Sequence, residues 1–143
     1  MARRVDPFVD NVWENTIHEG EPAHVYNLIA AGADINAKDK HGQTAIMLAS
    51  RNGQTDVVQL LVDANAELNV TAKYNLSALM LAVINHHDDV VRILVEAGAD
   101  LNLRGSGAPG FHNKTAAELA NDSGQEKVAA YLEQSQVSGV KDN

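Results

Sequence analysis

Two short motifs in the chain carry residue types that could support chemistry. The first is a glycine-rich run, Gly105-Ser106-Gly107-Ala108-Pro109-Gly110, which fits the pattern GxGxxG. A dinucleotide site needs this pattern directly between a strand and a helix of a βαβ unit. Here the run contains Pro109, the next expected helix starts only near Thr115, and the sequence has no βαβ pattern. We therefore interpret the run as a turn-rich loop and predict no nucleotide cofactor.

The second motif is the cluster His86-His87-Asp88-Asp89, whose side chains belong to types that bind metal ions. Neighbouring side chains on a turn point apart, so they rarely hold one ion together. Two aspartates at the start of a helix also have an ordinary structural role, because they interact favourably with the positive end of the helix dipole. We predict a structural cluster without a resident metal, with adventitious metal binding as the alternative.

Composition excludes several other classes of function. The chain has 143 residues, no cysteine and no Gly-x-Ser-x-Gly motif, so thiol catalysis and a nucleophile elbow are excluded, and we predict no enzyme. The net charge of −8 argues against a nucleic-acid partner, which needs a basic face. No apolar run approaches the roughly 18–20 residues of a membrane-spanning helix, and no secretory signal is visible. We expect a cytoplasmic protein that binds no membrane.

A repeat of 33 residues organises the chain. Asn36, Asn69 and Asn102 follow one another at this spacing, and each ends a similar stretch, such as Ala33-Asp34-Ile35 before Asn36. Matches at one fixed offset indicate stacked copies of a structural unit that buries a shared core only by stacking. The expected parts are one domain, 1–143, with units at about 6–38, 39–71, 72–104 and 105–135 and loose ends at 1–5 and 136–143.

Each unit reads as two short helices joined by a turn. Thr44 precedes the apolar run 45–50 and is the expected N-cap of a helix, with its hydroxyl bonded to a free backbone N–H group. Gly53 is suited to the left-handed conformation that ends this helix. The apolar residues of 56–62 lie on one face of a second helix. The small residues expected where neighbouring units meet are Ala49, Ala82 and Ala120.

These residues resemble the ankyrin repeat, which implies an all-α solenoid of stacked helix-turn-helix units with hairpin-like loops. The resemblance covers about 130 residues, and it is specific for the fold rather than for the function, because one scaffold serves many partners. The residues of the second unit that carry the resemblance are Asp39, Gly42, Thr44, Ile46, Ala49, Gly53, Val58, Leu60, Leu61, Ala66 and Asn69.

The chain departs from the family pattern in two places. Met47 and Met80 replace the histidine of the family motif Thr-Pro-Leu-His. In the family this histidine ties neighbouring loops together, so looser loops are expected here. The first unit lacks the motif, with Trp13 at its leucine position, and is typical of a solubilising cap. Pro22 suits the first turn of the second helix of that unit.

The fourth unit is longer than the others. The step from Ser77 to Thr115 is 38 residues instead of 33, so five residues are inserted, and we place them within 105–113. Two interpretations stay open. The insertion itself binds a partner, or it folds back on the third unit and covers Tyr74 and Leu76.

The resemblance implies that a partner protein binds along the concave face of the array. We predict a monomeric, non-catalytic interaction module in which Tyr74, Leu76 and Ile84 form an exposed apolar patch, a feature that often marks an interface. The alternative is a regulatory inhibitor whose acidic charge meets a basic enzyme or toxin surface. A metal-binding protein or an enzyme is disfavoured. The predicted partner-binding residues are Lys40, His41, Gln43, Arg51, Tyr74, Leu76, Ile84, Phe111 and His112.

Overall fold

The structure, a computed structural model, describes residues 12–141, and this part of the chain folds into paired α-helices. Within these residues there are eight α-helices, one 3₁₀-helix and no strand. The expected loose end at 1–5 and the last two residues of the chain lie outside the described residues. The helices are α1 Val12–Glu19, α2 Pro22–Ala30, α3 Ala45–Asn52, α4 Thr55–Asp63, the 3₁₀-helix Lys73–Asn75, α5 Ala78–Ile84, α6 Asp88–Glu96, α7 Ala116–Asp122 and α8 Glu126–Lys141.

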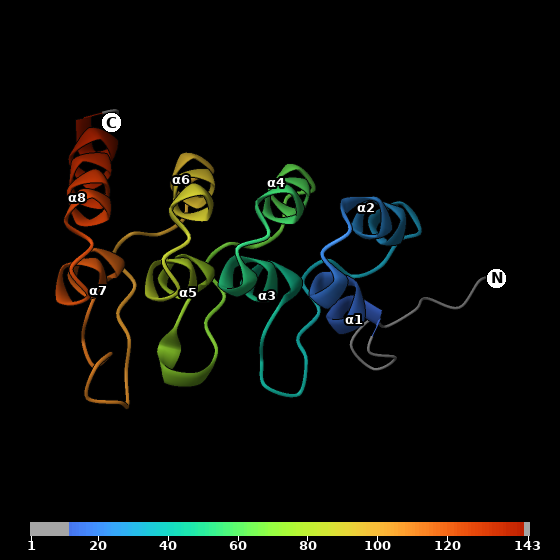
Figure 1. Cartoon of the computed structure of the whole chain (residues 1–143), viewed down its shortest axis with the longest axis horizontal. Helices are drawn as coiled ribbons and strands as arrows, with labels where there is room; N and C mark the ends of the chain where they lie inside the picture. Colours follow the sequence, from blue (N-terminus) through green and yellow to red (C-terminus); the bar gives the residue numbers. More distant parts are fainter. Residues whose placement is uncertain (1–11, 142–143) are drawn as a thin grey trace.

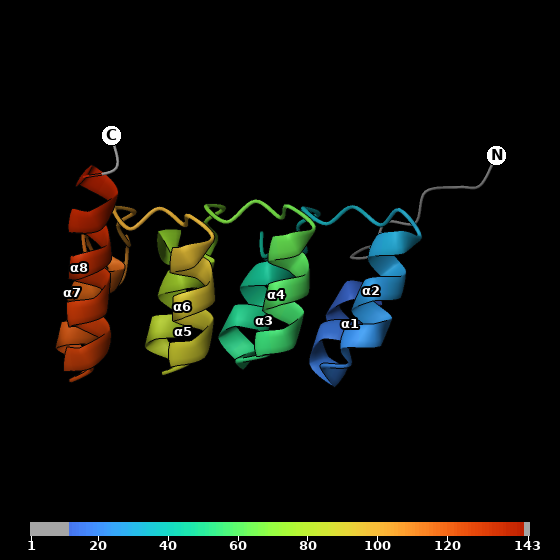
Figure 2. The same ribbon diagram turned by 90° about the horizontal axis from the view of Figure 1, so that it is seen from above.

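The helix pairs stack side by side into an elongated array with two layers (Figure 1). The first helices of the pairs, α1, α3, α5 and α7, form one layer, and the second helices, α2, α4, α6 and α8, form the other. Contacts join neighbours within each layer as well as the two helices of a pair. Seen from above, the loops between pairs follow one edge of the array (Figure 2). The predicted all-α solenoid of stacked helix-turn-helix units is confirmed.

Small side chains allow neighbouring pairs to approach closely. Ala49, Ala82 and Ala120 each have 0% exposure, which confirms that they belong to the buried contact region. Met47 and Met80, at 1% exposure, fill the same continuous core. Because close-packed interiors leave little free volume, a larger side chain at any of these alanines requires its neighbours to move.

The first pair closes the core with one large side chain. Trp13 on α1 is fully buried, and its Nε1–H donates to the backbone oxygen of Asp34 at 3.3 Å. Pro22 is the first residue of α2, where a missing N–H group is tolerated. The buried indole supplies this end of the array with the apolar volume that the family motif supplies elsewhere.

Two local predictions are wrong. Thr44 is the N-cap of α3, but its Oγ1 is buried without a partner among the described residues, whereas Ser77 and Thr115 do cap α5 and α7. The sequence identifies the cap position but not the rotamer that the hydroxyl adopts. The expected loose tail is also wrong for 136–141, because α8 continues to Lys141. No proline interrupts it, and one helical glycine costs only about 1 kcal/mol.

Asparagine side chains tie neighbouring loops together along one edge of the array. Asn36 and Asn69 each accept a bond from a backbone N–H group 31 residues further along. The looser loops expected where Met47 and Met80 replace histidine stay a prediction, because Asn69 belongs to the repeat pattern itself. The bonds run from Glu67 N–H to Asn36 Oδ1 at 2.9 Å, from Asp100 N–H to Asn69 Oδ1 at 2.8 Å and from Gln136 Nε2 to Asn102 Oδ1.

A second set of bonds links the turns between paired helices. The residue just before each of α4, α6 and α8 donates a side-chain bond to a backbone oxygen near the end of a first helix in the preceding pair. These turns lie at the opposite ends of the second helices from the asparagines, so both edges are held. The bonds run from Gln54 Nε2 to Ile17 O, from His87 Nε2 to Arg51 O at 3.0 Å and from Gln125 Nε2 to Val83 O at 2.8 Å.

Candidate interaction surface

Three loops project from the layer of first helices on the side away from the second helices (Figure 1). They precede α3, α5 and α7, and their tips are residues 38–43, 73–76 and 104–114. We call these tips together the hairpin surface. Loops held on a rigid scaffold are common places for binding residues.

The first tip is held by a single carboxylate. Asp39 Oδ1 accepts from the backbone N–H groups of His41, at 2.8 Å, and Gln43, at 2.9 Å. A backbone bond from Asp39 N–H to the oxygen of Gln43, at 2.9 Å, closes the loop. Lys40 and His41 are left exposed at the turn. This tip is fixed by bonds within its own six residues.

The second tip has an unusual backbone. Tyr74 has a φ of 61° and Asn75 has a φ of 57°, both in the left-handed region. Such a conformation is rare for a bulky side chain, and strain of this kind costs about 1–3 kcal/mol per residue. Surrounding contacts must therefore hold Tyr74 in place.

The insertion supplies these contacts. Ser106 N–H donates to the Tyr74 oxygen at 2.7 Å, and Asn75 Nδ2 donates to the Arg104 oxygen at 2.8 Å. Within the insertion, Gly105 N–H donates to the Lys114 oxygen at 2.9 Å. The segment 104–114 is therefore folded against the second tip, as one of the two open interpretations expected.

An aromatic pair lies at the centre of this contact. The rings of Tyr74 and Phe111 have centroids 5.6 Å apart and planes at 42°. Tyr74 remains 36% exposed, and Phe111 is half-buried. Lys73 Nζ lies 4.9 Å from the centroid of the Tyr74 ring. The pair thus offers a partly exposed apolar contact beside a positive charge, a combination common at binding hot spots.

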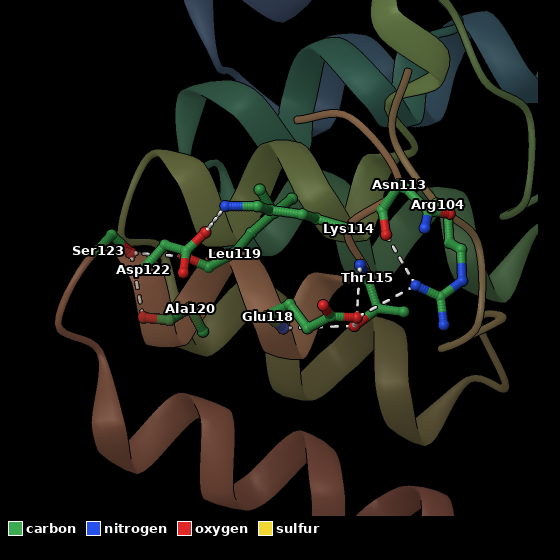
Figure 3. A network of polar contacts seen from close by, with 9 residues as sticks. All are labelled: Arg104, Asn113, Lys114, Thr115, Glu118, Leu119, Ala120, Asp122 and Ser123. Atoms are coloured by element: carbon green, nitrogen blue, oxygen red, sulfur yellow. Dashed lines mark hydrogen bonds and ion pairs between the residues drawn. The ribbon is translucent and has the colours of Figure 1, made fainter. Parts of the chain in front are cut away.

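A polar network fixes the base of the third tip on α7 (Figure 3). Arg104 Nη1 donates to the Asn113 oxygen at 2.7 Å and pairs with Glu118 Oε1 at 3.2 Å. Glu118 also completes a capping box with Thr115 at the start of α7. Lys114 Nζ contacts the carboxylate of Asp122, on the last turn of the same helix. The insertion is therefore bonded both to the second tip and to α7.

Seven of the nine predicted partner-binding residues lie within the three tips, and six of these seven are exposed or half-buried. Lys40, His41 and His112 are exposed, and Tyr74 lies at 36% exposure. Gln43 and Phe111 are half-buried. Lys73 is an exposed member of the same surface that the predicted set omitted. The charges of the individual loops, rather than the net charge of the whole chain, indicate Lys73 in the sequence.

The other three predicted residues are buried or lie away from the tips. Leu76 belongs to the second tip but is only 7% exposed, so the expected exposed patch of Tyr74, Leu76 and Ile84 is wrong at this residue. Its side chain is part of the hydrophobic core, against which Ile84 is half-buried. Arg51 and Ile84 lie on the last turns of α3 and α5, about 10 Å of helix from the tips.

The histidine and aspartate cluster lies at the opposite edge of the array. The ring of His87 bonds to the Arg51 oxygen, while Asp88 and Asp89 form the exposed first turn of α6. Two shallow hollows of about 380 and 390 Å³ flank His86. Among residues 12–141 no three metal-ligating side chains lie close enough together to hold an ion.

The glycine-rich run is the remaining motif of the sequence. It forms the turn of the insertion, where a side chain on Gly107 would meet the ring of Tyr74. No helix in the described part of the chain is both long and apolar enough to cross a membrane. Two large hydrophobic side chains are exposed among the described residues, Tyr74 on the hairpin surface at 36% and Tyr26 on α2 at 61%, and only Tyr74 has a second aromatic ring and a lysine beside it.

Comparison with known proteins identifies the repeat. No curated protein sequence matches the chain. A family model of ankyrin repeats in three copies matches residues 15–105, which is more than half of the chain. Beyond the matched residues, α7 and α8 add one more pair with the same helix-turn-helix arrangement. The chain belongs to the ankyrin-repeat family.

Proposed function

We propose that the chain is a non-catalytic module that binds a partner protein through the hairpin surface. Ankyrin repeats are generally modules of protein–protein interaction and typically have no catalytic role. The observation that carries the proposal is Tyr74, a bulky residue held at a φ of 61° and left partly exposed beside Phe111. Strained backbone costs stability and persists only where surrounding contacts hold it. Such positions cluster at functional sites.

The rigidity of the loops supports the same proposal. Asp39 fixes the first tip, and the insertion fixes the second and third tips, so little loop motion remains to be lost on binding. Rigid binding loops raise affinity because less conformational entropy is lost. Arg51 and Ile84 extend the proposed contact along the first helices, while Leu76 is buried in the core and does not contact the partner.

A second candidate function uses the opposite face. Asp88, Asp89 and Glu96 are exposed on α6, in the layer of second helices. A regulatory inhibitor that covers a basic enzyme or toxin surface would recognise it through these carboxylates. The two candidates therefore predict different contact residues on opposite layers.

Site-specific photo-cross-linking in cells distinguishes these candidates. A photo-reactive amino acid replaces His112 on the hairpin surface in one variant, and Glu96 on α6 in a second variant that serves as the matched exposed control. The cross-linked products are identified by mass spectrometry. A defined protein captured at His112 and not at Glu96 supports the proposed function. Capture at Glu96 alone would support the inhibitor. No cross-linked protein at either position would count against both.

Further features of the proposal are taken from the sequence. We propose that the module acts as a monomer in the cytoplasm and does not bind nucleic acid. Size-exclusion chromatography with light scattering tests the monomer, and fluorescence microscopy of the tagged chain tests the location. The unit boundaries near 38, 71 and 104 stay predictions, which limited proteolysis of the loops between pairs can test.

A further inference from the structure

Charge is divided unevenly between the hairpin surface and the rest of the chain. The chain has eleven Lys and Arg residues, nineteen Asp and Glu residues and a net charge of −8. Five of the eleven basic residues, but only one of the nineteen acidic residues, lie on the hairpin surface. This surface is therefore basic on an acidic protein. Its charged residues are Lys38, Asp39, Lys40, Lys73, Arg104 and Lys114.

Only part of this positive charge is neutralised within the molecule. Arg104 and Lys114 pair with carboxylates on α7. Lys40 and Lys73 are exposed and form no ion pair with any described residue. The carboxylate of Asp39 already accepts two backbone N–H bonds within its own loop. The first tip thus presents Lys38 and Lys40, which are both exposed and form no ion pair with a described residue, and the second tip presents Lys73.

We propose that the hairpin surface binds an acidic segment of the partner protein. In this arrangement two carboxylates of the partner contact Lys40 and Lys73. An apolar or aromatic side chain of the partner rests on Tyr74 and Phe111. This inference rests on the proposed function and adds the chemistry of the partner. Electrostatic complementarity of this kind determines specificity and the rate of association more than total affinity.

The spacing of the tips sets a register for the partner. Lys40 and Lys73 lie at the tips of consecutive loops, which precede the neighbouring helices α3 and α5. Packed helices lie about 8–10 Å apart, and an extended chain rises about 3.3 Å per residue. Carboxylates about three residues apart therefore match the two ammonium groups. The apolar side chain lies beyond the carboxylate at Lys73, on the side away from Lys40, because Tyr74 is next to Lys73 and Phe111 belongs to the third tip. In the partner's sequence it follows or precedes the two carboxylates according to the direction of the bound segment.

A peptide fits this surface better than a nucleic acid does. Nucleic-acid affinity depends on many cations that neutralise consecutive phosphates. Here two of the five cations are already paired, and acidic residues of α7 border the surface. A short segment with two carboxylates needs only Lys40 and Lys73, while the aromatic pair supplies apolar contact area.

Peptide selection tests the proposal. Random peptides of about twelve residues displayed on phage, a length that spans all three tips, are selected against the full chain. Peptides enriched in Asp or Glu about three residues apart, with an apolar residue at one end of the acidic pair, are expected. Fluorescence anisotropy with synthetic copies then compares the wild type with Lys40→Gln/Lys73→Gln and with the matched control Arg92→Gln/Lys127→Gln on the second helices.

The expected loss follows from the strength of exposed ion pairs. Each such pair contributes a factor of about 1.4 to 5 to a binding constant, so Lys40→Gln/Lys73→Gln should weaken binding about 2- to 30-fold. The control should remain within about twofold, and raising the salt concentration should weaken wild-type binding. Melting curves establish that both variants remain folded.

Other outcomes overturn the inference. Neutral or basic peptides that lose affinity on Tyr74→Ala would leave the proposed function intact but contradict the acidic partner. Selected peptides that bind Lys40→Gln/Lys73→Gln as tightly as the wild type, or an empty selection, would also contradict it. If a fluorescein-labelled oligo-dT bound the chain more tightly than the selected peptides do, the surface would be assigned to nucleic acid. Photo-cross-linking at His112 tests the proposed function separately from all of these results.

Discussion

Replacing Gly105 by alanine is expected to distort the insertion and thereby weaken its hold on the second tip. A Cβ atom at this position would lie 2.4 Å from the backbone oxygen of Phe111, whereas ordinary contacts begin near 3.4 Å. Residues 105 and 111, which both belong to the insertion, must therefore move apart by about 1 Å. The oxygen belongs to the backbone and accepts from Lys114 N–H at 3.2 Å, so no side-chain rotation can relieve the contact.

The magnitude follows from overpacking and from the bonds at risk. Overpacking costs about 1–3 kcal/mol, and each backbone bond lost with the insertion removes about 0.5–1.5 kcal/mol of net stability. We expect Gly105→Ala to lower the free energy of unfolding, measured by urea denaturation, by about 1–3 kcal/mol. Gly110→Ala is the control in the same loop, because nothing lies within 4 Å of its added Cβ. Equal stability of the two variants would refute the tight contact.

The same substitution tests whether the insertion holds Tyr74. Without the bond from Ser106 N–H, the Tyr74 backbone can leave the left-handed region. We therefore expect the amide signal of Tyr74 in NMR spectra to shift in Gly105→Ala and to remain unchanged in Gly110→Ala. A destabilised Gly105→Ala with an unchanged Tyr74 signal would show that other contacts maintain this conformation.

Three further predictions concern the stack itself. Gly53→Ala places a Cβ 2.5 Å from the His87 ring at a φ of 71°, whereas Gly124→Ala, at a φ of 78°, meets nothing within 4 Å. In denaturation, Gly53→Ala should therefore cost at least about 1 kcal/mol more, and His87→Ala should remove this excess. Ala82→Leu should cost about 1–3 kcal/mol by overpacking, and an unchanged melting curve would contradict the assigned stacking. Asn69→Ala should cost about 0.5–1.5 kcal/mol, and it should speed hydrogen exchange at the N–H group of Asp100, which donates a hydrogen bond to Asn69. Unchanged exchange at Asp100 would show that this bond is dispensable.

Much of the stack could be predicted from residue spacing because each repeat contacts only its neighbours. Gly53 was expected in the left-handed conformation that ends a helix, and its φ is 71°. Equivalent positions for the linking residues could also be predicted, because Gln54, His87 and Gln125 follow one another at the repeat steps of 33 and 38 residues. Periodicity thus carries information about polar links as well as about the core.

The hairpin surface was harder to predict because its conformation depends on contacts between repeats. Exposure of Leu76 was expected from its place in a loop, yet its side chain is part of the hydrophobic core. Nothing local in the sequence indicates that Tyr74 adopts a positive φ, because tyrosine rarely does so. The contact that accompanies this conformation comes from Ser106, which lies in the following repeat.

The first and second tips therefore differ in the contacts that hold them, and this difference links binding to folding of the last repeat. The first tip is closed by Asp39 from within, so it keeps its shape without its neighbours. The second tip depends on the insertion, which is itself fastened to α7 by Arg104. A partner that requires the observed Tyr74 conformation binds only when α7 is folded, so its binding must stabilise α7 in return. Peptide bound at the hairpin surface should thus slow hydrogen exchange in α7 and leave α1 unchanged, because coupling in a repeat array decays over neighbouring units.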